Sequence, residues 1–353
     1  MKIAVLLSGG VDSSVALNLV KREDGHEVTA FYLKIWLEDE LAFLGECPWE
    51  TDLYYAQAVC DQAGVPLRTI SLQTEYYEKV VEHAISELKA GRTPSPDILC
   101  NQRIKFGVFL DQIDPSFDKV ASGHYARIDK SEGQYLLKRA PDPVKDQTYF
   151  LSNLSQAQLS RALFPVGHLR KREVRALAEA FNLPNKARKD SQGICFLGKI
   201  KYNDFVKSYL GEKPGDIIEL ESGLKLGRHR GFWFYTIGQR RGLGLSGGPW
   251  FVVKKDIEHN IVYVSHQEVI ETRARNEFSV ANLNWIAGEP DRRKLQVKIR
   301  HSPQLEDCQL QWVEGVEERR AVVSLARPEA GIAPGQSAVF YDDELCLGGG
   351  VIE

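Results

Sequence analysis

Residues 2–22, KIAVLLSGGVDSSVALNLVKR, contain the turn that decides the fold of the first half of the chain. The aliphatic run at 2–7 predicts a buried strand, and the apolar spacing from Val15 to Val20 predicts the start of an amphipathic helix. Between them, SGGVDSS places two glycines, an aspartate and three serines in a short turn. Such a turn points backbone N–H groups into the mouth of a helix N-terminus, where partial positive charge favours a phosphate.

Two better-known phosphate loops do not fit this turn. A Walker loop has the pattern GxxxxGK[ST], but no lysine follows these glycines. The glycine spacing GxGxxG of dinucleotide-binding loops is missing as well. Ser8, Ser13 and Ser14 would add hydroxyl donors, and Asp12 could hold a magnesium ion or brace the loop. The structural alternative is a glycine turn in which Ser and Asp only cap the helix.

The segments that follow alternate between strand and helix patterns. This alternation predicts a mostly parallel, doubly wound sheet with helices on both faces and a ligand at the carboxyl ends of the strands. Gly64 and Gly91 are placed as helix stops. The predicted strands are 2–7, 28–36, 67–72 and 119–126, and the predicted helices are 49–64, 75–91 and 101–113.

After about residue 200 the pattern becomes β-rich. Short β-branched and aromatic runs alternate with Gly, Pro and Asn turns, as in 261–266, 295–300, 308–313, 320–327 and 336–341. We therefore predict an α/β domain at 1–202, a small β-rich domain at 203–269 and a C-terminal β-barrel at 270–353. The charged segment 268–277 is the expected joint between the last two domains.

Composition narrows the class of protein. A chain of 353 residues exceeds one hydrophobic core, and no apolar stretch is long enough for a bilayer, so no membrane partner is expected. Six dispersed cysteines without a CxxC pair indicate a reducing compartment. The net charge of -3 excludes a uniformly basic nucleic-acid binder, yet one face can still be basic. The basic segments are 169–175, 186–190, 199–201, 227–242 and 291–300.

A carboxylate and two cysteines form the second candidate site. Asp97 and Cys100 lie in GRTPSPDILCNQRIKFG, and Cys195 lies in KDSQGICFLGKIK. Both stretches are expected to be polar loops, where nearby positive charge lowers a thiol pKa. Two such thiols suit sulfur transfer, in which one carries a persulfide, the other resolves it and the carboxylate moves a proton. A zinc site is the competing hypothesis, and the other cysteines in regular segments, Cys60, Cys308 and Cys346, are expected in the core.

Eight motifs, in order along the whole chain, resemble the tRNA-specific 2-thiouridylase family of the PP-loop ATP pyrophosphatase superfamily. They are SGGVDSS (8–14), GRTPSPDILCNQRIKFG (91–107), SGHYAR (122–127), KDQTYFLSNLSQAQL (145–159), LFPVGHLRKREVR (163–175), KDSQGICFLGKIK (189–201), FWFYTIGQRRGLG (232–244) and PGQSAVFYDDELCLGGGVIE (334–353). The resemblance implies an N-terminal adenylation domain of the adenine nucleotide alpha hydrolase type, a small central domain and a C-terminal barrel. It implies a sulfurtransferase that replaces O2 of the wobble uridine, position 34, in tRNA-Lys, tRNA-Glu and tRNA-Gln.

The resemblance also implies cofactors and residue roles. ATP and Mg²⁺ would be required, with ATP lined by Leu6, Leu7, Ser8, Gly9, Gly10, Val11, Asp12, Ser13, Leu33 and Gly123. Asp97 would act as base, Cys195 would carry the persulfide, and Cys100 would release the sulfur, leaving a disulfide. A [4Fe–4S] cluster on Asp97, Cys100 and Cys195 is the alternative. The tRNA-contacting positions would be Ser95, Pro96, Asp97, His124, Lys145, Asp146, Gln147, Arg300, His301 and Gln336.

Some positions depart from the family pattern. Ser95 replaces the usual Asn, Gln192 replaces a common Thr, and His301 replaces an aromatic hydroxyl. A structural role for His124 and a plain exposed strand position for Arg300 stay open. So do two other functions, a tRNA-binding protein without chemistry and an amidating synthetase.

The resemblance has implications for partners and location as well. The implied partners are tRNA and a sulfur donor, either a cysteine desulfurase or a sulfur-relay protein. FYLKIW followed by GECPWETDLYYAQ is similar to the plant and algal organellar branch. The expected location is therefore the cytoplasm or, after loss of a transit peptide, a plastid or mitochondrial matrix.

Overall fold

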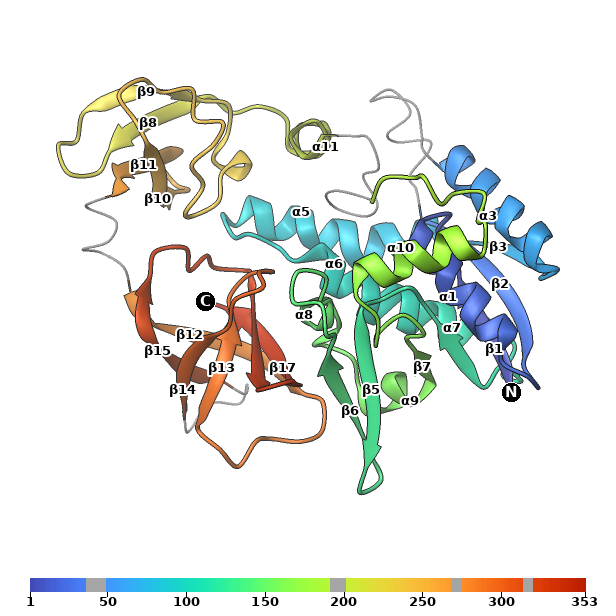
Figure 1. The fold of residues 1–353 in the computed structure, drawn as a ribbon. Coiled ribbons are helices and arrows are strands. Elements are labelled where there is room, and N and C mark those ends of the chain that lie inside the picture. The colour runs from blue at the N-terminus through green and yellow to red at the C-terminus, as the bar shows by residue number, and fades with distance from the viewer. Residues whose placement is uncertain (36–48, 191–200, 268–274, 314–319) are drawn as a thin grey trace.

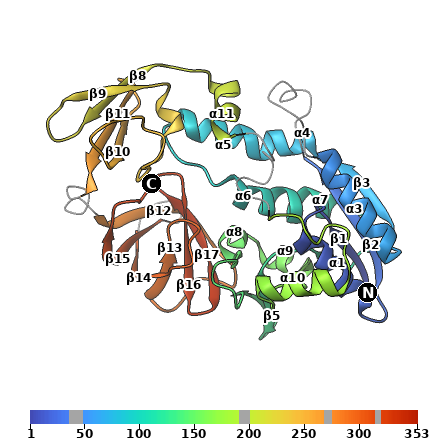
Figure 2. The ribbon, with the colours of Figure 1, turned by 45° about the horizontal axis from the view of Figure 1, so that its top comes forward.

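A computed structural model describes residues 1–35, 49–190, 201–267, 275–313 and 320–353 (Figure 1). Its N-terminal half is a parallel sheet with helices, followed by a small mixed sheet and a C-terminal barrel. In both views the two β-rich parts lie on the same side of the N-terminal domain (Figures 1 and 2). Helix α5 (Glu82–Lys89) points from the N-terminal domain toward the mixed sheet.

The N-terminal sheet has five parallel strands, which confirms the predicted α/β class. In spatial order they are β3 (Leu67–Ser71), β2 (Glu27–Lys34), β1 (Lys2–Leu6), β4 (Lys119–Ala121) and β7 (Ala162–Leu163). The order reverses direction at β1 and β4. In a doubly wound sheet the crevice for a ligand opens at this point, outside the carboxyl ends of the strands.

Helices cover both faces of this sheet because the side chains of a strand alternate. On β1, Ile3 and Val5 pack in one apolar cluster with Leu17 and Val59, whereas Ala4 packs in another with residues of the 96–112 helical region. The helices of this domain are α1 (Val11–Arg22), α3 (Trp49–Ala63), α4 (Gln73–Tyr76), η2 (Tyr77–Val81), α5, α6 (Pro96–Leu99), η3 (Cys100–Val108), α7 (Phe109–Gln112), α8 (Thr148–Leu151), α9 (Gln156–Arg161) and α10 (Lys171–Ala180).

The predicted segments are confirmed with one correction. Gly64 and Gly91 take positive φ values of 62° and 73° just after their helices, as stop residues do. The strand predicted at 119–126 is wrong as a single element, because β4 ends at Ala121 and a new strand begins at Ala126. Gly123 interrupts it, since its backbone packs against the first turn of α1.

The new strand belongs to a hairpin that the sequence did not predict. Strands β5 (Ala126–Ser131) and β6 (Gln134–Arg139) form this hairpin, and β6 pairs with β17 of the barrel through Leu137–Cys346 and Lys138–Leu345. A strand of the N-terminal domain thus extends the sheet of the C-terminal domain.

The β-rich second half divides as expected into two sheets. The small sheet follows α11 (Tyr202–Leu210) and contains β8 (Gly215–Glu219), β9 (Lys225–His229), η4 (Phe232–Phe234), β10 (Trp250–Asp256) and β11 (Ile261–His266). The barrel closes because β12 pairs with both β15 and β17. Its strands are β12 (Arg275–Trp285), β13 (Lys294–Lys298), β14 (Glu306–Trp312), β15 (Ala321–Glu329), β16 (Ser337–Asp342) and β17 (Leu345–Ile352).

Most of the predicted joint at 268–277 lies outside the described residues, which resume at Arg275. The domain boundaries at 202/203 and 269/270 therefore stay predictions. In the part of the chain that the structure describes, none of the helices combines the length and apolar character needed to cross a membrane.

Candidate active site

The glycine turn after β1 is a tightly packed structure. Gly9 has a φ of 73°, and a Cβ at this position would lie 2.2 Å from the carbonyl oxygen of Asp52 in α3. Both facts require glycine, because a side chain would be strained and would collide with backbone. Gly10 is the N-cap of α1, and its carbonyl accepts hydrogen bonds from Ser13 Oγ at 3.0 Å and Ser14 Oγ at 2.9 Å.

Two side chains from a distant part of the chain hold the backbone carbonyl of Gly9 by hydrogen bonds. Asn185 Nδ2 donates to the carbonyl oxygen of Gly9 at 2.7 Å, and Arg188 donates to the same oxygen at 2.9 Å. Arg188 also pairs with Asp52 at 2.6 Å. These two donors hold the Gly9 carbonyl in one direction and so fix the orientation of the peptide group that joins Gly9 to Gly10, the N-cap of α1.

Asp12, in the first turn of α1, is braced by two donors. The hydroxyl of Tyr125 donates to Asp12 Oδ1 at 2.9 Å, and Lys171 Nζ donates to the same atom at 2.6 Å. Lys171 also lies 2.8 Å from Asp190, which in turn pairs with Lys145 at 2.6 Å and with Arg175. Burial alone would raise the pKa of Asp190, but the hydrogen bonds from Lys145 and Lys171 outweigh it and hold that pKa far below its usual value.

Gly123 and Leu33, which the family resemblance assigns to the nucleotide, both lie near the carboxyl ends of strands of the parallel sheet. A Cβ on Gly123 would be 2.7 Å from the backbone nitrogen of Ser13, so the loop after β4 touches the first turn of α1. Leu33 is on β2 near its carboxyl end, next to the strand that leads into the glycine turn. The turn, Gly123 and Leu33 therefore share one end of the sheet, the turn and Gly123 after β1 and β4 and Leu33 on the adjacent strand β2.

The segment from Arg92 to Asp97 is a junction between all three parts of the protein. The amide of Thr93 donates to the carbonyl oxygen of Pro334 in the barrel at 2.7 Å, and its hydroxyl lies 3.4 Å from that of Thr236 beside the small sheet. The Tyr149 hydroxyl donates to the Ser337 carbonyl at 3.0 Å and hydrogen bonds with the Ser95 side chain. Ser95 is the N-cap of α6, which carries Asp97.

Cys100 is placed differently from the sequence prediction. The prediction of a polar loop away from any apolar face is wrong, because Cys100 begins η3, is 2 % exposed and packs in the same apolar cluster as Leu6 and Ile104. The reason is helical periodicity: Pro96, Cys100 and Ile104 recur every four residues and face the core together. The polar neighbours in the sequence lie on other faces of the helix.

The other cysteines divide into two groups. Cys60, Cys308 and Cys346 are buried, which confirms the prediction that they belong to the core. Burial raises the pKa of the Cys60 thiol and of the Cys308 thiol to about 12, so both are unreactive near neutral pH. Cys47 and Cys195, together with Gln192, lie outside the described residues, so the distance from Cys195 to Cys100 is not given by the structure.

Among the described residues, no group of three or more His, Cys, Asp or Glu side chains is arranged to hold a metal ion. Of the three ligands of the alternative iron–sulfur cluster, Asp97 and Cys100 are described and Cys195 is not. The buried position of the Cys100 thiol does not resemble an open ligand site.

The run Lys145–Gln147 is anchored by a buried ion pair. Asp146 is completely buried and pairs with Lys298 of β13 at 3.0 Å, and Lys298 is completely buried as well. Asp146 also bonds with Arg139 at 3.2 Å and with the hydroxyl of Thr148 at 2.9 Å. The enclosed carboxylate of Asp146 is therefore not available to tRNA in this structure, and its visible role is to hold the run against the barrel.

The residues of the barrel that were predicted to contact tRNA include His301, which lies beside the run Lys145–Gln147. His301 Nε2 is 3.2 Å from the Asp146 carbonyl oxygen, and its ring stacks on Phe150 at 4.6 Å between ring centres. Burial lowers the pKa of His301, so the ring is neutral at pH 7. Arg300 is half-exposed and pairs with Glu329 at 3.1 Å, while Gln336 follows the turn that touches Thr93.

His124 is a structural link between the two candidate sites. Its Nδ1 lies 2.7 Å from Ser122 Oγ, and its ring packs against Phe106 of η3 and against Phe164. Burial, followed by the nearby charge of Lys105, holds the pKa of His124 well below its usual value. These contacts favour the structural alternative that the sequence left open for this residue.

Sequence reasoning missed several residues of the glycine turn. Asn185, Arg188, Lys171 and Tyr125 all contact it, yet none of them has a role predicted from the sequence: Tyr125 and Lys171 occur within family motifs, and Asn185 and Arg188 lie in or next to the basic segment 186–190. Nothing in the local sequence places them there, because each is more than 110 residues away from the turn.

The strand order and the turn define an α/β domain of the nucleotide-binding class, and comparison with known proteins narrows the class further. Family models described as "tRNA methyl transferase HUP domain", "tRNA methyl transferase PRC-barrel domain" and "Aminomethyltransferase beta-barrel domain" match residues 1–199, 203–266 and 275–352. A tRNA-specific 2-thiouridylase MnmA 1 of Bacteroides thetaiotaomicron is 48% identical over 359 residues, covering 100% of this chain and 99% of the relative.

Two further relatives show the same extent of similarity. Those of Parabacteroides distasonis and Porphyromonas gingivalis, both described as tRNA-specific 2-thiouridylase MnmA, are each 46% identical, again covering 100% of this chain and 99% of the relative. The chain therefore belongs to the tRNA-specific 2-thiouridylase family, as its motifs predicted.

Proposed function

We propose that this protein is an ATP-dependent tRNA sulfurtransferase that replaces O2 of the wobble uridine, position 34, by sulfur. One observation supports this most directly: the glycine turn and the Asp97–Cys100 segment belong to the same α/β domain, and Cys100 is a member of the same large apolar cluster as Leu6, the last residue of β1. An enzyme that adenylates a base and then delivers sulfur to it needs these two kinds of group side by side.

In the first step the uridine O2 attacks the α-phosphate of ATP, and pyrophosphate leaves. Backbone N–H groups at Gly9, Gly10 and Val11 would bind the phosphates, and the hydroxyl of Ser13 lies beside them. Asp12 is 30% exposed, both of its braces use Oδ1, and it therefore fits a magnesium ion on the phosphates. Leu33 and Gly123 would line the adenosine.

In the second step the terminal sulfur of a Cys195 persulfide attacks C2 of the uridine, and AMP leaves with the oxygen. The Cys100 thiolate then attacks the Sγ of Cys195, which releases 2-thiouridine and forms a Cys100–Cys195 disulfide. A thiol reductant restores both cysteines, and a cysteine desulfurase or sulfur-relay protein renews the persulfide. Asp97, three residues before Cys100 on the same helical segment, is the proposed base.

Recognition of tRNA-Lys, tRNA-Glu and tRNA-Gln would use groups around the three-part junction. Ser95 and Pro96 lie beside Asp97 and would surround the flipped base. Lys145, Gln147, Arg300, His301 and Gln336 are proposed to contact the RNA, while Asp146 and His124 act by holding these neighbours in position. The proposed location stays the cytoplasm or an organelle matrix.

The persulfide route is preferred to an iron–sulfur cluster. If a cluster were bound, Asp97, Cys100 and Cys195 would be its ligands and it would hold the sulfur to be transferred. Cys100 packs in an apolar cluster at 2 % exposure, which suits a thiol that emerges to resolve a disulfide better than an open iron ligand.

The test uses the full chain with ATP, Mg²⁺, cysteine, a cysteine desulfurase and unmodified tRNA-Lys transcript. We expect 2-thiouridine at position 34 by nucleoside mass spectrometry and one AMP per thiolated tRNA. Cys100→Ser should abolish the product and trap a disulfide between Cys195 and the tRNA, whereas Cys60→Ser, at another buried cysteine, should retain it.

Methylated uridine, or AMP formation without sulfur in the tRNA, would refute the proposal. The first outcome would match the methyl transferase wording of the family models, and the second would match an amidating enzyme. Repeating the assay without oxygen, with and without iron, separates the persulfide route from the cluster.

A further inference from the structure

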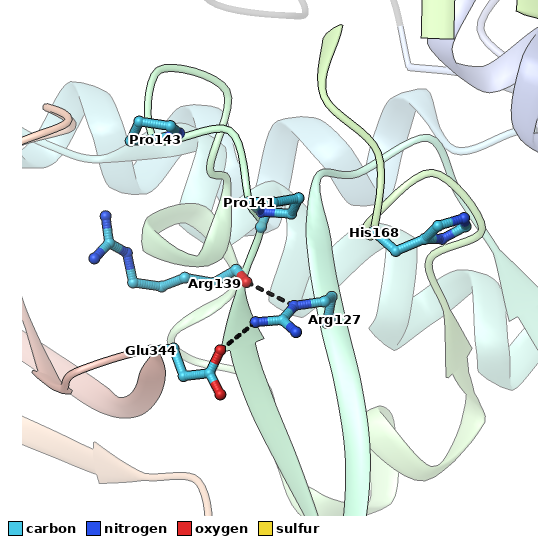
Figure 3. A pocket seen from close by; sticks show the side chains of 7 residues that line it. Arg127, Arg139, Pro141, Pro143, His168 and Glu344 are labelled. Carbon is cyan, nitrogen blue, oxygen red and sulfur yellow. Dashed lines mark hydrogen bonds and ion pairs between the residues drawn. The ribbon is translucent and has the colours of Figure 1, made fainter. Parts of the chain in front are cut away.

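A hollow of about 500 Å³ lies between the N-terminal domain and the barrel, apart from the site described above (Figure 3). Its lining comes from the β5–β6 hairpin, the loop at 140–143, the turn at His168 and the β16–β17 turn. Arg127, Arg139 and His168 are potential cations in this lining, and Glu344 is its one carboxylate. None of the residues predicted to bind ATP or tRNA lines it.

Close backbone packing builds this hollow. A Cβ on Gly167 would lie 1.7 Å from the carbonyl oxygen of Ala126, so the turn before His168 is seated directly on the start of β5. On the other side, the pairing of Lys138 with Leu345 brings Glu344 to the hairpin, and the Arg139 amide donates to the Glu344 carbonyl at 2.7 Å. Residues from three distant parts of the chain are therefore held together by main-chain contacts.

The carboxylate of Glu344 sits between two cations. One of its oxygens pairs with the guanidinium of Arg127, and the other lies 3.4 Å from Lys138 Nζ. Arg127 is oriented by a second bond, from its Nε to the carbonyl oxygen of Arg139 at 2.9 Å, which Figure 3 shows. Glu344 is 55% exposed, and ion pairs this exposed add little stability, so a more highly charged anion can displace it.

We propose that this hollow binds a backbone phosphate of the tRNA, with Arg127 as the main donor and Glu344 as the group that the phosphate displaces. A guanidinium offers a planar pair of N–H donors that matches a phosphate. The loop from Pro141 to Pro143 continues directly into Lys145, so an RNA strand passing Lys145 can reach the hollow. This inference rests on the proposed function, because it takes tRNA as the ligand.

Two substitutions with opposite expected effects test the phosphate site. Arg127→Gln should weaken binding of unmodified tRNA-Glu about five- to tenfold and should lower the slope of log Kd against log salt by about 1, as expected for one lost phosphate contact. Glu344→Gln removes the competing carboxylate and should tighten binding about two- to fivefold, because Arg127 then loses its ion pair, while Lys138 keeps its pair with Asp129 at 2.8 Å. Fluorescence anisotropy at several salt concentrations measures both.

Matched control residues lie on β2 and β3, toward the edge of the parallel sheet opposite to β7. Arg68→Gln on β3 and Glu27→Gln, whose carboxylate pairs with Lys2 at 3.9 Å, change the same charges away from the hollow and should leave Kd unchanged within about twofold. If Arg127→Gln proves unstable in thermal unfolding, Arg127→Lys, which keeps the charge, and Glu344→Gln still decide the question.

The outcomes separate this inference from the proposed function. The phosphate site is refuted if Arg127→Gln leaves Kd and salt slope unchanged, or if Glu344→Gln weakens binding as a purely structural ion pair would. In either case thiolation by the unmodified protein would leave the proposed function standing. If the opposite effects appear but no 2-thiouridine forms, the phosphate site stands and the sulfur chemistry is wrong. A chain that does not bind tRNA refutes both.

Discussion

The glycine turn and the Cys100 segment belong to the same domain but differ in how far each is ready to react in the structure. In the turn, the carbonyl of Gly9 accepts hydrogen bonds from Asn185 and Arg188, and the carbonyl of Gly10 accepts hydrogen bonds from two serines. Cys100, in contrast, is 2 % exposed in an apolar cluster. The glycine turn is thus already ordered without tRNA, whereas the Cys100 thiol, in its proposed role of releasing sulfur, must first be uncovered.

This difference suits the order of the proposed reaction. A thiol that is enclosed until the base is adenylated cannot reduce the Cys195 persulfide prematurely or react with small oxidants. The helical segment η3, which begins at Cys100, has π-type geometry and a backbone distortion at Gly107, with φ of -114° and ψ of -105°. Such segments are often found at functional sites, and this one offers a place where the helix can rearrange.

The largest expected effect comes from disturbing the turn. Gly9→Ala should weaken ATP binding by at least about 100-fold, because the Cβ would collide with the Asp52 carbonyl and φ is positive. Gly25→Ala is the matched control, since Gly25 has a similar φ of 81° but no atom within 4 Å of the added Cβ. Isothermal titration with ATP measures both. Equal losses in the two variants would mean that backbone strain, not close packing, controls the site.

A second, smaller effect concerns access to Cys100. In the protein without ligands, iodoacetamide should modify Cys100 about 30-fold more slowly than a cysteine introduced by Ser95→Cys, because burial requires local opening of about 2 kcal/mol. Cys60 should be protected to a similar degree. Peptide mass spectrometry follows each site separately. Rapid labelling of Cys100 would show that its thiol is already accessible and would remove the contrast between the two regions.

The smallest expected effect concerns His124, whose ring contacts Ser122 and Phe106. Burial lowers the folded-state pKa of His124 well below that of the unfolded chain, so the unfolded state binds more protons between pH 7 and 5.5. The free energy of unfolding should therefore fall as pH falls through this range, with His124 contributing up to about 1.4 kcal/mol per pH unit. Urea unfolding measures the slope, which His124→Gln should reduce and His259→Gln, at an exposed site, should not. An unchanged slope in His124→Gln would mean that the ring is not held neutral by its surroundings.

Local patterns were sufficient to predict the first strand, the turn and helix that follow it, the helical segments at 49–64, 75–91 and 101–113, and the β-rich second half; the helices α8 to α11 were not predicted. They failed where distant segments decide the result. The single strand predicted at 119–126 is divided because Gly123 packs on α1, and the pairing of β6 with β17 joins residues that are more than 200 positions apart. Asn185 and Arg188 could not be assigned to the turn for the same reason.

The burial of Cys100 could have been predicted from the sequence. Pro96, Cys100 and Ile104 follow the four-residue spacing of one helix face, and this spacing, rather than the polar residues between them, decides that Cys100 is buried. The predicted contact between Cys100 and Cys195 stays a prediction, because Cys195 lies outside the described residues.

The pairing of β6 with β17 also limits how such a protein can be recombined. A gene fragment ending near residue 202 would encode the hairpin without its neighbour in the barrel, leaving an open backbone edge of the kind that promotes aggregation. A barrel transplanted from another protein would need to match that edge in register as well as in sequence. Hairpin and barrel should therefore be inherited, exchanged or engineered as a single module, although more than 130 residues separate them along the chain.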